Sequence, residues 1–392
     1  MTKKAFLNKF QKEEIIEFPH QEIADPIVSV CVQTYWHENY IRKCLEGILE
    51  QKTNFEFEIL LGEDDSPDNT RQICIEYAKK YPEKIRLFLH DRANNIKING
   101  NPTGRFNFLY NLYSARGKYI TLCEGDDYWT DPNKLQKQVD FLEVNEDFAI
   151  TFCNVLIKNE NENIPAYPGY QNEKVSSEYL IQTIPTPKKV SDIYDIAKGN
   201  FIHTPGVVFR NIFRENPVPG YMKAVPIGDW PLYMYISRYG KIAYTDEIMT
   251  VYRVHNSGAF SSVSEARKEY LGLNQYPPMI QEGIFDNKIL KIWENHLVSK
   301  LADFFKQYLN LITENEFSIL IENFNSLSPS ILIKSIELLT NEIKEKNEAI
   351  LGIQSSRSYN LSLKLKYIMR FFYRKFPFSN YLKKGQKSEI LN

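Results

Sequence analysis

The segment CEGDDYW, residues 123–129, places three carboxylates within four residues, namely Glu124, Asp126 and Asp127. The apolar segment KYITL comes directly before it, so the acids follow a predicted buried strand. Carboxylates crowded at such a point repel one another unless a positive charge lies among them. A Mg²⁺ or Mn²⁺ ion bound to a polyphosphate would supply that charge. The alternative is a plain turn in which Gly125 relaxes the backbone and Asp127 bonds local amides.

The segment GEDDSPDNT, residues 62–70, carries a second group of acids after the apolar segment FEILL. A calcium loop that starts at Asp64 would need Gly at its sixth position and Glu at its twelfth, where this chain has Asn69 and Ile75. That kind of site is therefore excluded. Asp68 is typical of a helix cap, and the Ser-Pro pair before it is typical of a turn.

Glu63 and Asp64 are not explained by a cap or a turn. A carboxylate at a strand end can accept the ring N–H of a uracil-type base. Thr34 and Tyr35, at the end of the preceding strand, offer backbone groups and an aromatic ring that can contact such a base. These four residues are our candidates for contacts with a nucleotide.

The elements that must position these acids alternate between strand and helix. This order predicts an α/β fold with a mostly parallel sheet flanked by helices, in which ligands bind at the carboxyl ends of the strands. Asp131 is predicted to cap the helix 131–145, with Pro132 at its first position. Residues 158–190 are polar and contain several prolines, which indicates an irregular excursion. The predicted strands are 27–32, 57–62, 85–90, 118–125, 148–157 and 241–255, and the predicted helices are 38–51, 68–82, 106–117 and 131–145.

Composition excludes several classes of protein. The formal net charge of -1 over 392 residues gives no general attraction to nucleic acid. The 5 cysteines show no CxxC spacing, so neither a disulfide framework nor a zinc site is indicated, and a reducing cytoplasm fits best. The N-terminus is too charged for a signal-peptide core, and no apolar run approaches the roughly 20 residues that span a bilayer. We expect a cytoplasmic protein, soluble or bound peripherally at the inner face of the cell membrane.

Beyond about residue 262, strands and glycines become rare and helical spacing dominates. We predict a lead-in at 1–25, a catalytic domain at 26–262, a helical region at 263–345 and a basic amphipathic tail at 346–392. Within the tail, residues 357–387 hold nine Lys or Arg and no Asp or Glu. Its apolar stripe suits either an anionic membrane surface or packing on the protein itself.

Three segments resemble, in order and spacing, the nucleotide-binding half of family-2 inverting glycosyltransferases of the bacterial polysaccharide and glycolipid type. The likeness covers about residues 26–260 and implies the GT-A fold, extended here by C-terminal helices. The three segments are VSVCVQTYWHENYIRKCLEGILEQ, EILLGEDDSPDNT and GKYITLCEGDDYWTDPNKLQKQVDFLE.

The resemblance implies roles for the acids at the strand ends. The family's acid at the second strand end contacts the nucleobase, and it falls on Asp64. The family's Asp-x-Asp motif falls on Glu124 to Asp126, with Glu in place of the first Asp. Asp126 is then the ligand of Mn²⁺ or Mg²⁺, and Glu124 faces the ribose or a metal-bound water.

The resemblance also implies a catalytic base and a histidine near the metal. The base is a carboxylate at the N-terminus of a later helix, which is Asp229 in GDWPLYMYI; alone, such an Asp is typical of a helix cap. The helix terminus is expected to keep it ionised. His255 follows the last predicted strand, near the metal or diphosphate, although a lone histidine is more often structural. His203 and Thr204 suit either the acceptor or a buried turn.

The chain departs from the family at two points. Gln33 stands where the family usually has Pro. Arg105 and Asn107 are one residue too far apart to match the family's Arg-Asn pair, so neither receives a diphosphate role.

The predicted activity is inverting transfer from a nucleoside-diphosphate sugar, a UDP-sugar first, to a hydroxyl of a saccharide or lipid-linked acceptor. Nucleic acid is not expected as a partner. The alternative is a non-catalytic, membrane-associated protein that binds nucleotide sugars or acts as a scaffold. A nucleotidyltransferase is disfavoured, because QTYWHENY lacks the glycines and basic residues of a phosphate loop.

Overall fold

A computed structural model describes residues 1–350 except 22–23, 99, 161–169, 176–177, 184–186, 259, 261, 309–310 and 328. The chain divides into two compact units, Met1–Trp293 and Glu294–Asn392. This division lies later in the chain than residue 262, where the sequence changes character. The predicted lead-in contributes α1 (Lys3–Phe10) and β1 (Ile16–Glu17) to the first unit.

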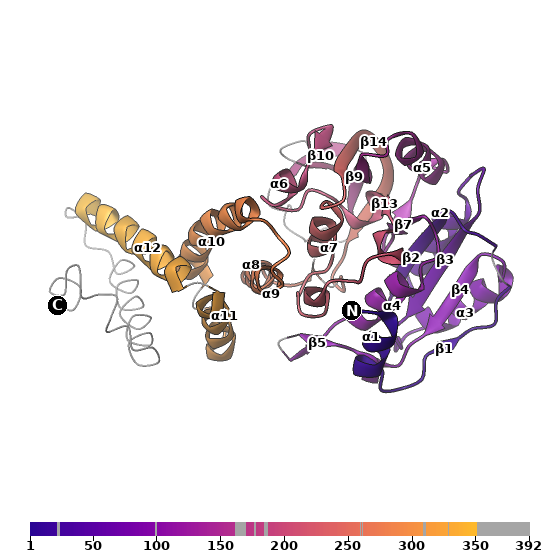
Figure 1. The fold of residues 1–392 in the computed structure, drawn as a ribbon, viewed down its shortest axis with the longest axis horizontal. Helices are drawn as coiled ribbons and strands as arrows, with labels where there is room; N and C mark the ends of the chain where they lie inside the picture. Colours follow the sequence, from indigo (N-terminus) through magenta and orange to yellow (C-terminus); the bar gives the residue numbers. More distant parts are fainter. Residues whose placement is uncertain are drawn as a thin grey trace. The chain divides into compact units, whose positions relative to one another are not determined.

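The first unit is built on a ten-stranded mixed sheet (Figure 1). The strands β4, β3, β2 and β7 lie side by side and are parallel, as are β9 and β14, whereas β1, β8, β12 and β13 pair antiparallel with their neighbours. The α/β class is confirmed, and the parallel half of the sheet comes from the first part of the chain. In sheet order the strands are β1, β4 (Ile85–Leu89), β3 (Phe57–Glu63), β2 (Val28–Thr34), β7 (Tyr119–Leu122), β13 (Val207–Arg210), β9 (Phe148–Asn159), β14 (Lys241–Val254) and β12 (Val190–Ser191), with β8 (Tyr128–Trp129) on β14.

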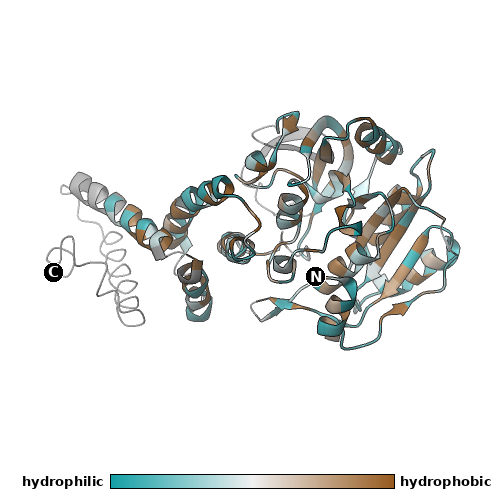
Figure 2. Cartoon of the chain, in the orientation of Figure 1, coloured by the Kyte–Doolittle hydropathy of each residue, from teal (hydrophilic) through white to brown (hydrophobic). Residues whose placement is uncertain are grey.

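Helices cover both faces of the parallel half. Alternate side chains of a strand point to opposite faces, and Val28, Val30 and Val32 of β2 lie in a core cluster with residues of α2 (Ile41–Leu49), α3 (Thr70–Lys80) and α5 (Lys134–Val144). On the other face α4 (Arg105–Ser114) packs on β2 and β3, with α1 against it. Figure 2 shows the apolar colouring of β2 and β3 between these layers.

The register brings the carboxyl ends of the parallel strands together. Thr34 at the end of β2 pairs with Glu63 at the end of β3, and Cys31 pairs with Leu122 at the end of β7. The loops that follow these strands therefore leave the same edge of the sheet. That edge is where the sequence predicts nucleotide and metal contacts.

Two local predictions were wrong. The helix α5 begins at Lys134 rather than at Pro132, and Asp131 accepts a hydrogen bond at 2.8 Å from the backbone N of Asn133, in the turn before the helix. The stretch predicted as irregular contains two strands. The strand β9 continues to Asn159, and β10 (Tyr170–Val175) pairs antiparallel with β11 (Glu178–Thr183). Cross-strand pairing overrides the polar composition there.

The remaining elements are mostly helical. Within the described residues, no helix combines the length and apolar character needed to cross a bilayer. The predicted stripe of the basic tail lies in 351–392, outside the described residues. The remaining bounds are β5 (Lys97–Ile98), β6 (Asn101–Pro102), α6 (Ile193–Ile196), α7 (Asp229–Ile236), α8 (Glu265–Leu273), α9 (Tyr276–Gln281), α10 (Asn287–Tyr308), α11 (Glu314–Leu327) and α12 (Pro329–Ile350).

Candidate active site

Asp126, in the loop after β7, lies between two imidazoles. Its Oδ2 is 3.0 Å from Nε2 of His255, just after β14, and 3.6 Å from Nε2 of His37, in the loop between β2 and α2. The structure thus joins Asp126 and His255, which the sequence predicts as a pair. His37 was missed by the sequence reasoning, although a histidine shortly after a strand end that also bears Thr34 and Tyr35 was an available signal.

The charge on this cluster favours a cation. Burial raises the pKa of Asp126, but His37 and His255 outweigh it and hold that pKa at about 2, so the carboxylate is ionised at neutral pH. Burial lowers the pKa of His37, which leaves a neutral imidazole with a lone pair. Carboxylate oxygen and imidazole nitrogen are both ligands of divalent transition ions.

The cluster does not form a complete metal cage. In the part of the chain that the structure describes, no group of three or more His, Cys, Asp or Glu is placed to hold a metal ion. In enzymes that use nucleotides, Mg²⁺ is usually held by one or two carboxylates together with water and substrate phosphate oxygens. Asp126 and His255 therefore fit a divalent ion whose remaining ligands come from a phosphorylated substrate.

Glu124 and Asp127, the neighbours of Asp126, differ from it in their environments. Burial, followed by the charges of Asp126 and Asp229, raises the pKa of Glu124 to about 8. Asp127 is buried and its Oδ1 accepts a hydrogen bond at 2.8 Å from the backbone N of Arg253, while burial raises its pKa well above the usual range. The Asp127 side chain thus ties the loop to β14. The simpler alternative predicts bonds to local amides, whereas the amide that it accepts from here belongs to Arg253, 126 residues further along the chain.

Asp64, predicted to contact a nucleobase, lies buried beside Tyr35 and is linked to it by Arg92. The Asp64 Oδ2 accepts hydrogen bonds from Nη1 of Arg92 at 2.7 Å and from Nδ2 of Asn95 at 3.3 Å. The Arg92 guanidinium lies 3.9 Å from the centre of the Tyr35 ring. Burial raises the pKa of Asp64 to about 6 despite this ion pair. Arg92, far away in the sequence, was not foreseen.

Thr34 and Glu63, the other two nucleotide candidates, have intramolecular partners. The Thr34 Oγ1 is 3.2 Å from Nδ1 of His37, so Thr34 orients an imidazole of the Asp126 cluster. Glu63 is fully buried and accepts hydrogen bonds from the backbone N of Ser66 at 2.7 Å and from Nε of Arg71. These contacts occupy both carboxylate oxygens of Glu63 and hold the loop after β3 against α3.

Asp229, the predicted base, is the first residue of α7 and is half-buried. Its Oδ2 accepts a hydrogen bond at 2.8 Å from Nδ2 of Asn200, and its Oδ1 has no hydrogen-bond partner. Burial raises the pKa of Asp229, and the amides of the helix terminus and Arg105 oppose it only in part. The helix terminus thus favours the ionised form of Asp229, as expected, but burial has the larger effect on its pKa. The raised pKa brings this carboxylate nearer to the range of a general base.

The remaining candidates are mostly structural. Arg105 and Asn107 are buried; Arg105 donates to the carbonyl of Val225 at 3.0 Å, and Asn107 donates to the carbonyl of Gly62 at 2.8 Å. Burial lowers the pKa of His203 to about 4. Thr204, in contrast, hydrogen-bonds to the side chain of Glu124 and so belongs to the acidic group.

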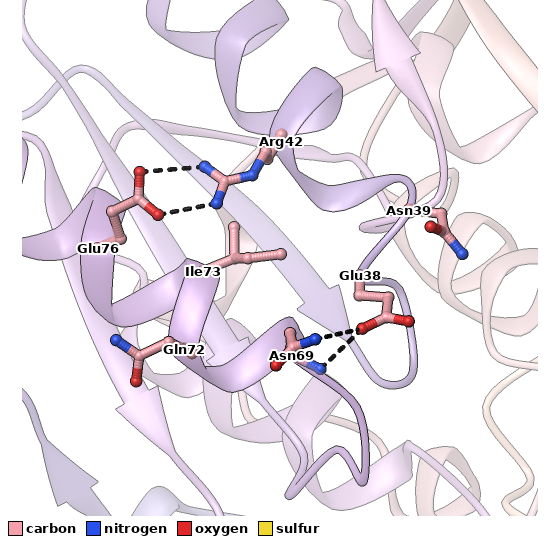
Figure 3. Close-up of a pocket in the computed structure, with 7 residues that line it drawn as sticks. All are labelled: Glu38, Asn39, Arg42, Asn69, Gln72, Ile73 and Glu76. Carbon is pink, nitrogen blue, oxygen red and sulfur yellow. Dashed lines mark hydrogen bonds and ion pairs between the residues drawn. The ribbon is translucent and has the colours of Figure 1, made fainter.

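A separate surface pocket lies between the beginnings of α2 and α3 (Figure 3). A bidentate ion pair between Arg42 and Glu76 and hydrogen bonds from Asn69 to Glu38 cross it. None of the predicted site residues lines this pocket. Its lining residues are Glu38, Asn39, Arg42, Asn69, Gln72, Ile73 and Glu76.

Comparison with known proteins identifies relatives over the sheet domain. The sequence profile of the family described as Glycosyl transferase family 2 matches residues 29–213. A protein of Mycobacterium tuberculosis described as uncharacterized is 34% identical over 243 residues, which cover 62% of this chain and 63% of that protein. The chain therefore spans less than two thirds of the length of this relative.

Two further matches have descriptive names. The minor teichoic acid biosynthesis protein GgaA of Bacillus subtilis is 29% identical over 186 residues, covering 46% of this chain and 36% of GgaA. Residues 1–349 of S. aureus TarS, solved in complex with UDP, match with a TM-score of 0.52 at 16% identity, over 88% of this chain and 91% of that one. This last likeness shows a shared fold.

Proposed function

Because the chain is a family-2 glycosyltransferase, we propose that it transfers a sugar, with inversion, from a nucleoside-diphosphate sugar to a hydroxyl of a saccharide or lipid-linked acceptor. UDP is the nucleotide we propose first. The observation that carries the proposal is the placement of Asp126 between two imidazoles at the edge where the parallel strands end.

The proposed reaction is one displacement. Asp229 accepts the proton of the acceptor hydroxyl, the oxygen forms a bond to the anomeric carbon, and the bond from that carbon to the diphosphate oxygen breaks on the opposite face. The nucleoside diphosphate leaves with the electron pair, and the anomeric configuration inverts. The unpartnered Oδ1 of Asp229 is the atom that suits this proton transfer.

The proposed donor site combines the two groups at the strand ends. Asp64 accepts the ring N–H of the base, Tyr35 and Thr34 border it, and Glu124 faces the ribose. Asp126 and His255 hold Mn²⁺ or Mg²⁺, which when bound neutralises charge on the departing diphosphate. Since GgaA is named for teichoic acid biosynthesis, we propose a cell-envelope polymer or its lipid-linked precursor as the acceptor.

Thermal denaturation tests the donor site, because a ligand that binds only the native state raises the melting temperature. UDP, GDP, dTDP and CMP are each added with Mn²⁺, Mg²⁺ or a chelator. We expect one nucleoside diphosphate to raise the melting temperature in a metal-dependent manner, and Asp126→Asn to abolish the metal-dependent part. Asp140→Asn, on the exposed side of α5, is the matched control and should respond as the unaltered chain does. A metal-dependent shift that survives Asp126→Asn would remove Asp126 from the metal site.

Turnover tests the base. Replacing Asp229 by Asn keeps the side-chain shape but removes the proton acceptor, so we expect the thermal shift with nucleotide to persist while hydrolysis or transfer of the donor falls about 10²- to 10⁴-fold. Full activity in Asp229→Asn would contradict the assignment. A protein that binds the nucleotide sugar but turns over none of it would instead support the non-catalytic alternative.

A further inference from the structure

Arg105, the first residue of α4, is a buried cation to which the proposed reaction gives no role. The residue is 6% exposed, and its Nη2 donates at 3.0 Å to the carbonyl of Val225. Its Nε has no hydrogen-bond partner, and across the described residues no carboxylate lies within ion-pair distance of the guanidinium. Burying a guanidinium with so few partners costs free energy, so the position calls for a physical reason.

The guanidinium lies against the segment 225–228, which leads into Asp229, the predicted base. A Cβ added to Gly228 would lie 2.0 Å from Nη1 of Arg105, so this glycine is needed for the close approach. Gly228 is the N-cap of α7, and Asp229 follows it. Arg105 therefore contacts the segment that leads into Asp229 at two points, the carbonyl of Val225 and the Cα of Gly228.

The charged groups around Asp229 make Arg105 the cation of this part of the site. When both are ionised, Glu124, after β7, and Asp229 repel each other, and both charges act on the hydroxyl of Tyr233 one turn further along α7. Asn200 donates a hydrogen bond but carries no charge. Arg105 is the positive group that acts on Asp229, where it offsets a part of the effect of burial on the pKa of that carboxyl.

We propose that Arg105 is the positioning residue of the catalytic base: it fixes the turn between Val225 and Gly228 so that Asp229 meets the acceptor hydroxyl, and it keeps Asp229 ionised. This inference rests on the proposed function, since it takes Asp229 as the base. It also assigns Arg105 to the acceptor side of the reaction rather than to the diphosphate.

The test compares Arg105→Met and Arg105→Lys in the pH dependence of donor hydrolysis, with UDP-N-acetylglucosamine and Mn²⁺ as the first probe. Removing the cation raises the pKa of Asp229, so less of the base is ionised at a given acidic pH. For Arg105→Met we expect the acidic limb of kcat/KM to move up by about one pH unit and kcat to fall about tenfold, with the KM for the donor unchanged. Arg105→Lys should restore most of kcat and most of the original position of the acidic limb.

A second variant keeps the charge but displaces it. Gly228→Ala pushes the guanidinium away from the turn, and we expect kcat to fall without a change in the KM for the donor. The thermal shift with UDP and Mn²⁺ shows that each variant is folded and binds the nucleotide. Arg42→Met, which removes an exposed guanidinium paired with Glu76, is the control and should leave the pH profile unchanged.

The outcomes separate this inference from the proposed function. An Arg105→Met protein with an unmoved acidic limb and a raised KM for the donor would overturn the positioning role and place Arg105 on the diphosphate. If Asp229→Asn abolishes turnover while the Arg105→Met profile is normal, only the inference fails. If Asp229→Asn is fully active, the proposed base fails, and the role of Arg105 fails with it.

Discussion

Lys134, at the start of α5, is a charged group inside the sheet domain. Its side chain is completely buried, its Nζ lies 3.5 Å from Oγ1 of Thr121, and the ring centre of Trp129 is 4.3 Å away. Burial lowers the pKa of Lys134 from its ordinary value of 10.5 to about 8. The folded protein therefore carries a desolvated ammonium at neutral pH, which a long hydrogen bond, an aromatic face and the charge of Asp131 compensate in part.

We predict that Lys134→Met stabilises the protein at pH 7. The lowered pKa corresponds to about 3 kcal/mol of unfavourable free energy while the group is charged, and loss of the two contacts reduces the net gain to about 1–2 kcal/mol. Between pH 8 and pH 10.5 the unfolded chain holds a proton that the folded chain releases, so the unaltered protein becomes more stable as pH rises. The advantage of the Met variant should therefore vanish near pH 10.

Urea unfolding of both proteins at pH 7 and pH 10 measures this difference. Lys52→Met, on the surface, is the matched control and should show the same stability difference from the unaltered chain at both pH values. If Lys134→Met were less stable than the unaltered protein at pH 7, the ammonium would stabilise the fold by more than its contacts with Thr121 and Trp129 explain.

At the residue scale, sequence reasoning found the acids and His255 but missed two further partners of these acids. Asp64 and Asp126 follow apolar strands, and that local pattern is visible in the chain. His37 and Arg92 reach the same acids only because separate loops converge at one edge of the sheet. Residue spacing carries no information about such convergence, so it does not pair His37 with Asp126 or Arg92 with Asp64.

At the scale of elements, α1 supports the helix that carries Arg105. Phe6 of α1 is completely buried, and its ring centre lies 5.0 Å from that of Phe106 in α4 and 5.2 Å from that of Tyr113. The segment predicted as a lead-in is thus part of the core of the first unit. Its short helix was not foreseen, because eight residues give too few turns for a clear helical period.

We predict that Phe6→Ala lowers the free energy of unfolding by about 3 kcal/mol, because it removes a buried ring and leaves a cavity against α4. Asn8→Ala, on the exposed side of the same helix, should change it by less than about 0.5 kcal/mol. Guanidinium unfolding measures both variants. Equal, small effects at the two positions would show that α1 is not packed in solution as it is in the structure.

The parallel and antiparallel halves of the sheet differ in how far the sequence determines them. A strand, a helix and a strand in succession favour a parallel pair, so the order of β2, β3 and β4 follows from local pattern. The strand β13 inserts between β7 and β9, which precede it by many residues. Its short apolar segment gives neither its neighbours nor its direction.

At the scale of the whole molecule, the distribution of tryptophan makes the two compact units distinguishable. All 4 tryptophans, Trp36, Trp129, Trp230 and Trp293, lie within Met1–Trp293. Helices occur in both units, including α11 and α12 in the second. Tryptophan fluorescence therefore reports on the unit that holds the proposed site, whereas helical circular dichroism reports on both.

We predict that thermal unfolding followed by the two signals will not coincide, because two compact units need not unfold as one cooperative system. UDP with Mn²⁺ should raise the midpoint of the fluorescence transition, since the ligand stabilises only the unit that binds it. The part of the dichroism transition that comes from the second unit should keep its midpoint. Asp126→Asn should remove the shift from the fluorescence transition. Coincident transitions that shift together would instead show that the helices after Trp293 unfold with the sheet, and ligand binding in the first unit would then stabilise the whole chain.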